Sequence, residues 1–212
     1  MKRMSRMKTF RINDIFYSLQ GEGRNTGRAA VFIRFAGCNL KCSFCDTEFD
    51  SYKEMTADEI VKAIADYEAK FVVLTGGEPT LQADDEFIDL LHTNGYEVAM
   101  ESNGTRNAPK NIDWLTVSPK IMNNNMENGD TRIPDEIKIV FTQQCDPEEI
   151  LSAYIKRFGT IEKNSYPLLY LQPCDTGNSE LNKKIMSNCI DYIEKHPKWR
   201  LSLQTHKLIN IK

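Results

Sequence analysis

Hydrophobic positions along the chain fall into two alternating patterns, short continuous apolar runs and amphipathic stretches. Apolar runs such as 71–74 are typical of strands buried on both faces of a parallel sheet. Apolar residues at helical spacing follow Thr56, which forms a capping-box pattern with Glu59. The patterns predict strands at 10–19, 31–35, 71–74, 96–101, 112–117, 137–141, 168–171 and 199–203. They predict helices after Thr56, across 87–91, and over 147–158 and 178–195.

This order of elements predicts an α/β fold. Strands that alternate with helices imply a parallel sheet with right-handed crossovers. About ten residues separate 96–101 from 112–117, too few for a crossover helix. About six parallel strands and four helices are too few for a closed eight-stranded barrel. We therefore expect one domain over 1–212, an open, partial (β/α) barrel of about six parallel strands, with 1–8 as a disordered tail.

Composition narrows the possible functions. The chain has 212 residues, 41% of them hydrophobic, and a net charge of −3. No basic stripe is present to neutralise phosphates, which argues against nucleic-acid binding, and no apolar run is long enough to span a membrane. Three of the six cysteines lie in one short segment, which suits a reducing compartment better than a disulfide framework. We expect a cytoplasmic protein.

Cys38, Cys42 and Cys45 follow the apolar run 31–35 with the spacing C-x3-C-x2-C. Thiolates on such a loop can converge on zinc or on an iron–sulfur cluster, and no fourth Cys or His nearby completes the set. The alternative is a zinc knuckle completed by a distant Cys or His. Polar segments also follow other strands, and in open α/β folds the carboxyl ends of strands meet at one mouth. A zinc knuckle does not require that convergence.

Several of these polar segments have a chemical and a purely structural interpretation. Gly76 and Gly77 can let a small polar molecule approach the backbone, or simply form a tight turn. Gln20 and Glu22 offer a carboxamide and a carboxylate to a guanine-like edge, or belong only to a hairpin turn. Arg34 needs an anion such as a substrate carboxylate if it points inward, but not if it lies on an outer face.

Three further segments remain open in the same way. Thr47 can bind Mg²⁺ through its hydroxyl, or cap the end of the cysteine loop together with Asp46. The segments 118–120 and 172–175 place polar groups where ribose hydroxyls or a carboxylate can bind, or form ordinary X-Pro turns. Of the three histidines, His206 is the one expected at the mouth.

Taken together, these motifs resemble radical S-adenosylmethionine (SAM) enzymes and, within them, the 7-carboxy-7-deazaguanine synthase family. The resemblance runs from about Phe10 to the C-terminus and includes 20–23, the three cysteines with Asp46 and Thr47, 76–79, 118–120, 172–175 and 204–207. It implies a lyase of queuosine and 7-deazapurine biosynthesis. The reaction converts 6-carboxy-5,6,7,8-tetrahydropterin to 7-carboxy-7-deazaguanine with loss of ammonia, and SAM is used catalytically.

The resemblance also implies a set of site residues. Cys38, Cys42 and Cys45 would hold a [4Fe–4S] cluster and Thr47 a Mg²⁺ ion. The SAM site would comprise Phe44, Cys45, Asp46, Gly77, Glu78, Ser118, Pro119, Lys120, Gln172, Pro173, Cys174 and Asp175. The pterin site would comprise Leu19, Gln20, Gly21, Glu22, Arg34, Thr75 and His206. No catalytic residue beyond the cluster and SAM is assigned. The implied partners are an electron donor such as flavodoxin or ferredoxin and a second copy of the chain.

Three alternatives stay open from the sequence. A glycyl-radical enzyme activase shares the cysteine motif but needs a protein-docking face in place of a pterin pocket. A non-enzymatic zinc-binding module would bind zinc and neither iron nor sulfide. A diverged member of the same family would act on another pterin or purine.

Overall fold

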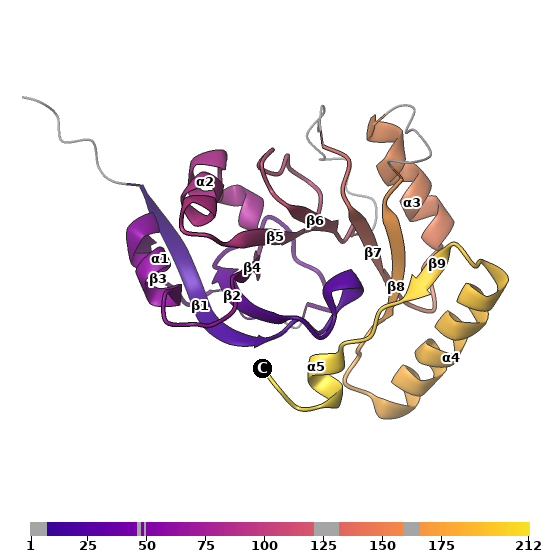
Figure 1. Cartoon of the computed structure of the whole chain (residues 1–212). Helices are drawn as coiled ribbons and strands as arrows, with labels where there is room; N and C mark the ends of the chain where they lie inside the picture. The colour runs from indigo at the N-terminus through magenta and orange to yellow at the C-terminus, as the bar shows by residue number, and fades with distance from the viewer. Residues whose placement is uncertain (1–7, 46–47, 49, 121–131, 159–165) are drawn as a thin grey trace, which may run out of the picture.

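A computed structural model describes residues 8–45, 48, 50–120, 132–158 and 166–212. Within these residues, nine strands form one curved sheet, and all but the last of the α-helices lie on its outer side (Figure 1). The strand order is β3-β1-β2-β4-β5-β6-β7-β8-β9. The strands are β1 Thr9–Leu19, β2 Ala29–Phe35, β3 Lys53–Thr56, β4 Phe71–Gly76, β5 Glu97–Ser102, β6 Trp114–Val117, β7 Glu136–Phe141, β8 Leu168–Pro173 and β9 Trp199–Leu201. The α-helices are α1 Ala57–Ile64, α2 Asp85–Thr93, α3 Pro147–Ile155, α4 Ser179–Lys195 and α5 Thr205–Leu208.

The sheet is mostly parallel and does not close. β2 and then β4 through β9 pair in parallel, which gives seven parallel strands among the described residues instead of the expected six. β1 pairs antiparallel with both β2 and β3 at the other edge. The prediction of an open, partial barrel is confirmed. The sequence did not predict β3, because this four-residue edge strand buries only Met55 and carries no apolar run.

The helices begin where the sequence indicated. Thr56 caps α1, accepting from the Glu59 backbone N–H, while the Glu59 carboxylate accepts from the Thr56 backbone N–H at 2.7 Å. The predicted last strand is shorter than expected and ends at Leu201. The segment expected to be a strand-end loop forms the short helix α5 instead. Residues 103–113, all of them described, contain no helix, as the short spacing predicted.

Successive residues of a strand point alternately to the outer core and to the barrel interior. On β7, Ile137, Ile139 and Phe141 pack into the large core between the sheet and the outer helices. Lys138 and Val140 point the other way, into the barrel interior. A smaller apolar cluster fills part of that interior, formed by Phe16, Ala30, Phe32, Phe71, Val73 and Ala99. The interior therefore holds both an apolar layer and the polar side chains described next.

No described helix combines the length and the apolar character needed to cross a bilayer.

Candidate active site

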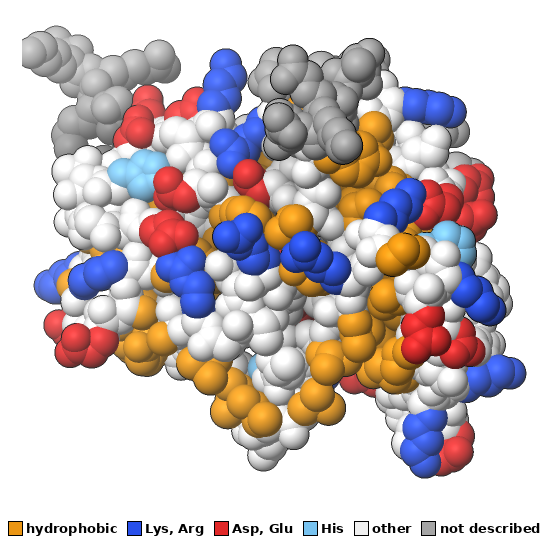
Figure 2. All heavy atoms as spheres, turned by 45° about the vertical axis from the view of Figure 1, so that its right-hand side comes forward, with side chains coloured by type: hydrophobic (Ala, Val, Ile, Leu, Met, Phe, Trp, Pro, Cys, Tyr) orange, Lys and Arg blue, Asp and Glu red, His pale blue; other side chains and the backbone are white. Residues whose placement is uncertain are grey.

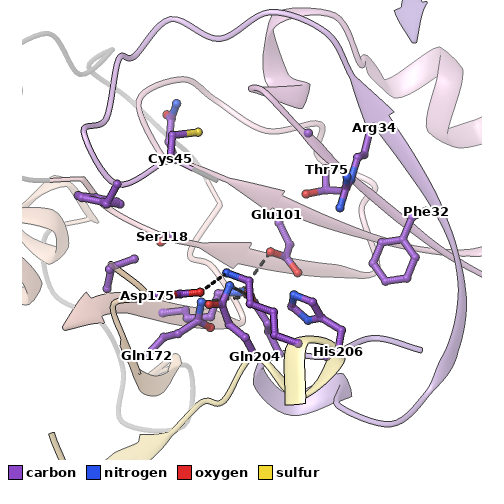
Figure 3. A pocket seen from close by; sticks show the side chains of 18 of the residues that line it. Phe32, Arg34, Cys45, Thr75, Glu101, Ser118, Gln172, Asp175, Gln204 and His206 are labelled. Carbon is purple, nitrogen blue, oxygen red and sulfur yellow. Dashed lines mark hydrogen bonds and ion pairs between the residues drawn. The ribbon is translucent and has the colours of Figure 1, made fainter. Parts of the chain in front are cut away.

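A cavity of about 460 Å³ opens beyond the carboxyl ends of the parallel strands (Figure 3). Side chains from β2, β4, β5, β7, β8 and the segments that follow them border it. The structure brings most of the predicted site residues to this one cavity: Leu19, Gln20, Gly21, Glu22, Arg34, Cys38, Cys42, Phe44, Cys45, Thr75, Gly77, Ser118, Lys120, Gln172, Pro173, Cys174, Asp175 and His206. Their roles remain predictions, but their convergence is a feature of the fold.

The start of the cysteine loop is fastened to the end of β4 by backbone hydrogen bonds. Gly77 N–H donates to Phe35 O and Glu78 N–H donates to Gly37 O, each at 2.9 Å. A Cβ atom on Gly77 would lie 1.9 Å from Gly37 O, and Gly76 has a φ of +108°. The cysteine loop can pack against β4 only if glycine stands at these positions. This requirement corresponds to the interpretation of Gly76 and Gly77 as a tight turn.

The three thiols of the loop all border the cavity. Burial raises the pKa of Cys38 and of Cys42, and the charge of the neighbouring loop thiols raises it further. A bound cationic centre removes that penalty, because it stabilises thiolates directly. Among the described residues, no group of three Cys, His, Asp or Glu side chains could hold a single metal ion. In a cluster each thiolate binds a different iron, so three thiols that border one cavity fit an iron–sulfur cluster.

Deeper in the cavity, Gln20, Glu22, Glu101 and Lys138 form a connected group that we call the Lys138 network. Lys138 is only 4% exposed, and its Nζ donates to Glu22 Oε2 and, at 3.1 Å, to Glu101 Oε2. Gln20 Nε2 donates to Glu101 Oε1 at 2.8 Å. Burial alone would lower the pKa of Lys138, yet the charges of Glu101 and Glu22 keep it above its ordinary value. The ammonium group therefore stays charged between two carboxylates.

Glu22 accepts more hydrogen bonds than the sequence suggested. Its Oε1 accepts from Gln172 Nε2 at 3.1 Å and from Gln204 Nε2 at 3.0 Å, in addition to the Lys138 contact on Oε2. Burial by itself would raise the pKa of Glu22, but the charge of Lys138 and these donors outweigh it and the pKa lies below its ordinary value. A carboxylate has about four acceptor positions, so Glu22 keeps about one for a ligand.

Arg34 points inward from β2, as one of its two interpretations required. It is paired in register with Thr75 on β4, and Figure 3 shows the two side chains next to each other. Its guanidinium carbon lies 4.9 Å from the centre of the Phe16 ring. Among the described residues, no hydrogen bond or ion pair reaches the guanidinium group. Arg34 is therefore a cation with room for an anionic ligand.

His206 enters the cavity from α5. Thr205 donates to Gly21 O through both its backbone N–H and its Oγ1, at 3.0 Å each. The imidazole lies so close to Gly21 that a Cβ there would be 2.1 Å from His206 Nδ1. These contacts join the C-terminal helix to the turn after β1, and they bring His206 and Glu22 into one site.

Two further polar pairs border the cavity, one of Lys120 with Ser118 and one of Lys207 with Asp175. Lys120 Nζ donates to Ser118 Oγ at 2.7 Å, and burial together with the charge of Lys138 lowers the pKa of Lys120. Lys207 Nζ pairs with Asp175 Oδ2 at 3.0 Å, a contact drawn in Figure 3. Ligands in this part of the cavity meet a mixture of donors and acceptors.

Some predicted site residues are not brought to the cavity. Glu78 is fully buried, and its carboxyl group accepts hydrogen bonds from Thr80, Ser102 and Asn103. Pro119 does not border the cavity. Asp46 and Thr47 lie outside the described residues.

Sequence reasoning missed other residues that border the cavity, above all Phe16, Phe32, Glu101 and Lys138. Gln204 and Lys207 also border it, and both belong to the motif 204–207 that the sequence had singled out. The signal for Lys138 was present, since it is a charge within the apolar run 137–141. The same criterion had singled out Arg34.

Comparisons with known proteins show the family to which this chain belongs. The family model of the radical SAM superfamily matches residues 32–153. A 7-carboxy-7-deazaguanine synthase from Bacteroides thetaiotaomicron is 49% identical over 203 residues, which cover 95% of this chain and 98% of the relative. One from Burkholderia multivorans is 38% identical, covering 96% of this chain and 99% of the relative. The crystal structure of QueE from Escherichia coli superimposes with a TM-score of 0.73 at 27% identity, covering 92% of this chain and 93% of that one.

The open parallel sheet with its three-cysteine loop defines a radical SAM enzyme, a class that uses a [4Fe–4S] cluster and SAM. Within that class, the chain belongs to the 7-carboxy-7-deazaguanine synthase family.

Proposed function

We propose that this cavity is the active site in which the chain converts 6-carboxy-5,6,7,8-tetrahydropterin to 7-carboxy-7-deazaguanine with release of ammonia. One observation carries the proposal: the three cysteines and the residues expected to face the pterin border the same cavity. A glycyl-radical enzyme activase would need a protein-docking face in place of the pterin part of this pocket, and a zinc module would need no such pocket beside the cysteine loop.

Cys38, Cys42 and Cys45 would hold the cluster. The predicted SAM-site residues that border the cavity, among them Phe44, Ser118 and Asp175, would hold SAM. When bound, the cluster and SAM would supply the radical chemistry that the reaction needs. The residues of the chain would contribute by orienting the ligands and by excluding water from the cavity. Ser118 and Lys120, joined by their hydrogen bond, offer donors to the SAM carboxylate and ribose.

The pterin would lie between β2 and the Lys138 network. Arg34 and Thr75 would bind its carboxylate, since Arg34 has no competing anionic partner among the described residues. Gln20 and Glu22 would face the ring edge, with Leu19, Gly21 and His206 around it. Because Glu22 has about one acceptor position left, a ring that donates two N–H groups to it must displace the Gln172 or Gln204 side chain.

Thr47 would hold a Mg²⁺ ion, which would supply positive charge for binding the substrate carboxylate. The support for this role is its place in the sequence, directly after Cys45 and Asp46. A hydroxyl oxygen suits Mg²⁺, which keeps most of its remaining ligands as water or substrate.

We propose one domain over 1–212, a cytoplasmic location, an electron donor such as flavodoxin or ferredoxin, and a homodimer. Apolar side chains reach the surface on the face shown in Figure 2. Among the described residues, the most exposed large apolar side chains include Leu208 and Ile209, at the end of α5 and just after it. Acidic and basic side chains are interspersed on that face, which supports the absence of a nucleic-acid partner (Figure 2).

Anaerobic turnover tests the proposed function. The protein is reconstituted with iron and sulfide, then given dithionite, SAM, Mg²⁺ and carboxytetrahydropterin, and the product is identified by mass. We expect 7-carboxy-7-deazaguanine without net consumption of SAM, and lower turnover when Mg²⁺ is omitted. Formation of deoxyadenosine without deazaguanine would contradict the substrate assignment. Zinc binding with no cluster would contradict the enzyme assignment.

The Cys42→Ala variant is the matched control for that assay. Two thiolates do not retain the cluster, so we expect loss of iron, sulfide and all turnover. Cys189→Ala, which changes a buried cysteine of the outer core, should keep the full iron and sulfide content.

A further inference from the structure

Lys138 stands out among the charged residues that the proposed function does not use. Its side chain is 5% exposed, and its Nζ contacts one carboxylate from the turn after β1 and another from β5. Removing it would leave the Glu22 and Glu101 carboxylates close together without the ammonium group that contacts both. Two carboxylates that share a buried site do not both stay ionised.

We propose that Lys138 is a positioning residue, whose ammonium group fixes the orientation and the negative charge of Glu22 and Glu101 at the inner wall of the cavity. The proposal rests on the proposed function for the identity of the substrate, but not for the coupling of the three side chains. Lys138 acts through the carboxylates and need not touch the substrate itself.

The two carboxylates differ in how many hydrogen bonds they accept. Glu22 is held by three donors, from β7, β8 and the segment before α5. Glu101 is held by Lys138 and Gln20, one donor on each oxygen. Each of its oxygens therefore keeps an acceptor position open toward the cavity. Among the described residues, only Lys138 donates hydrogen bonds to both carboxyl groups, so it sets their relative position.

The other charged groups around the network do not replace Lys138. Glu136, from the same strand, adds a third carboxyl group, and burial raises its pKa. Lys120 and His206 are the other basic side chains that face the network. The Nζ of Lys120 is bonded to Ser118, and no hydrogen bond joins either of these two side chains to Glu22 or Glu101 among the described contacts.

The test combines steady-state kinetics across a pH series with infrared detection of protonated carboxyl groups. In Lys138→Met, at least one of the two carboxylates should take up a proton near neutral pH. KM for carboxytetrahydropterin should rise roughly tenfold or more at pH 7, since a pKa one unit above the working pH leaves about a tenth of the group ionised. KM should fall again as the pH rises, whereas the wild-type KM stays flat. The value of kcat should change little, because binding is what is lost.

Infrared spectra of the cluster-free protein give a readout that does not depend on turnover. Lys138→Met should gain one protonated carboxyl band at pH 7 relative to wild type. Lys198→Met is the matched control, because Lys198 also pairs with a glutamate, Glu148, but far from the cavity. It should gain no such band and keep the wild-type pH profile. Lys138→Arg keeps the positive charge and should stay close to wild type in the infrared spectrum.

If Lys138→Met does not fold, the double variant Lys138→Met/Glu101→Gln decides the matter, because it removes the pair of like charges. It should show no extra protonated carboxyl and a KM that is raised equally at every pH. Wild-type infrared and pH profiles in Lys138→Met would overturn the proposal, as would an extra protonated carboxyl band in the double variant. A wild-type protein that does not convert the pterin would contradict the proposed function instead, and the infrared result would still decide the role of Lys138.

Discussion

Glu78 shows how a residue within a recognisable site motif can serve the fold. It is completely buried, and its carboxyl group accepts from Thr80 N–H and Oγ1, Ser102 Oγ and Asn103 N–H at distances of 2.7 to 3.1 Å. These donors lie after β4 and at the end of β5. Glu78 therefore ties two neighbouring strand ends together beneath the cavity rather than presenting its carboxyl group to SAM.

Glu78→Ala should lower the free energy of unfolding by about 2–4 kcal/mol, because it leaves several buried donors without an acceptor. Urea denaturation followed by circular dichroism measures the change. Glu180→Ala, which removes an exposed partner of Lys183, should leave the midpoint nearly unchanged. An unaltered midpoint in Glu78→Ala would mean that these donors find other partners.

At the scale of elements, the cysteine loop depends on β4 for its position. Its first residues are hydrogen-bonded to the backbone at the end of β4, and no side chain fits between them. The glycines at this strand end are thus part of the metal site without being ligands.

Gly77→Ala should displace the loop, because its Cβ would collide with backbone that cannot rotate away. We expect a reduced iron and sulfide content after reconstitution. Gly95→Ala is the control: it introduces strain of about 1 kcal/mol at a φ of +81°, with open space around the Cβ. It should lose some stability but bind the cluster fully. Equal cluster content in both variants would show that the close approach does not matter.

How far the sequence predicted these elements depends on how local each signal is. The apolar runs and the Thr56 cap are local, and they gave the parallel strands and the start of α1 correctly. Lys138 and Glu101 are separated by 37 positions, and Lys138 and Glu22 by 116. Only the curvature of the sheet brings them together, so their pairing could not be read from spacing. Position 77 likewise requires glycine because a Cβ there would collide with the backbone of Gly37, which is distant in sequence.

At the scale of the molecule, one continuous sheet links both ends of the chain. Trp114 lies on β6 in the middle of the sheet and Trp199 on β9 at its edge, and they are the only two tryptophans. Because hydrogen-bonded neighbours connect them through β7 and β8, they should report the same unfolding event.

Variants with a single tryptophan, Trp114→Phe and Trp199→Phe, test this expectation. In each variant, the urea midpoint from the remaining fluorescence should coincide with that from circular dichroism. Separate midpoints for the two probes within one variant would contradict a single cooperative domain over 1–212.

The alternation of side chains along the strands has a consequence for how this protein tolerates change. On β7, substitutions at 137, 139 and 141 act on the outer core, whereas those at 138 and 140 act on the cavity. In a scan of all single substitutions, changes at 137, 139 and 141 should mainly lower the amount of folded protein in the cell. Changes at 138 and 140 should mainly lower enzymatic activity. Substrate specificity and stability can therefore evolve largely independently, because the cavity-facing and core-facing positions alternate along each strand.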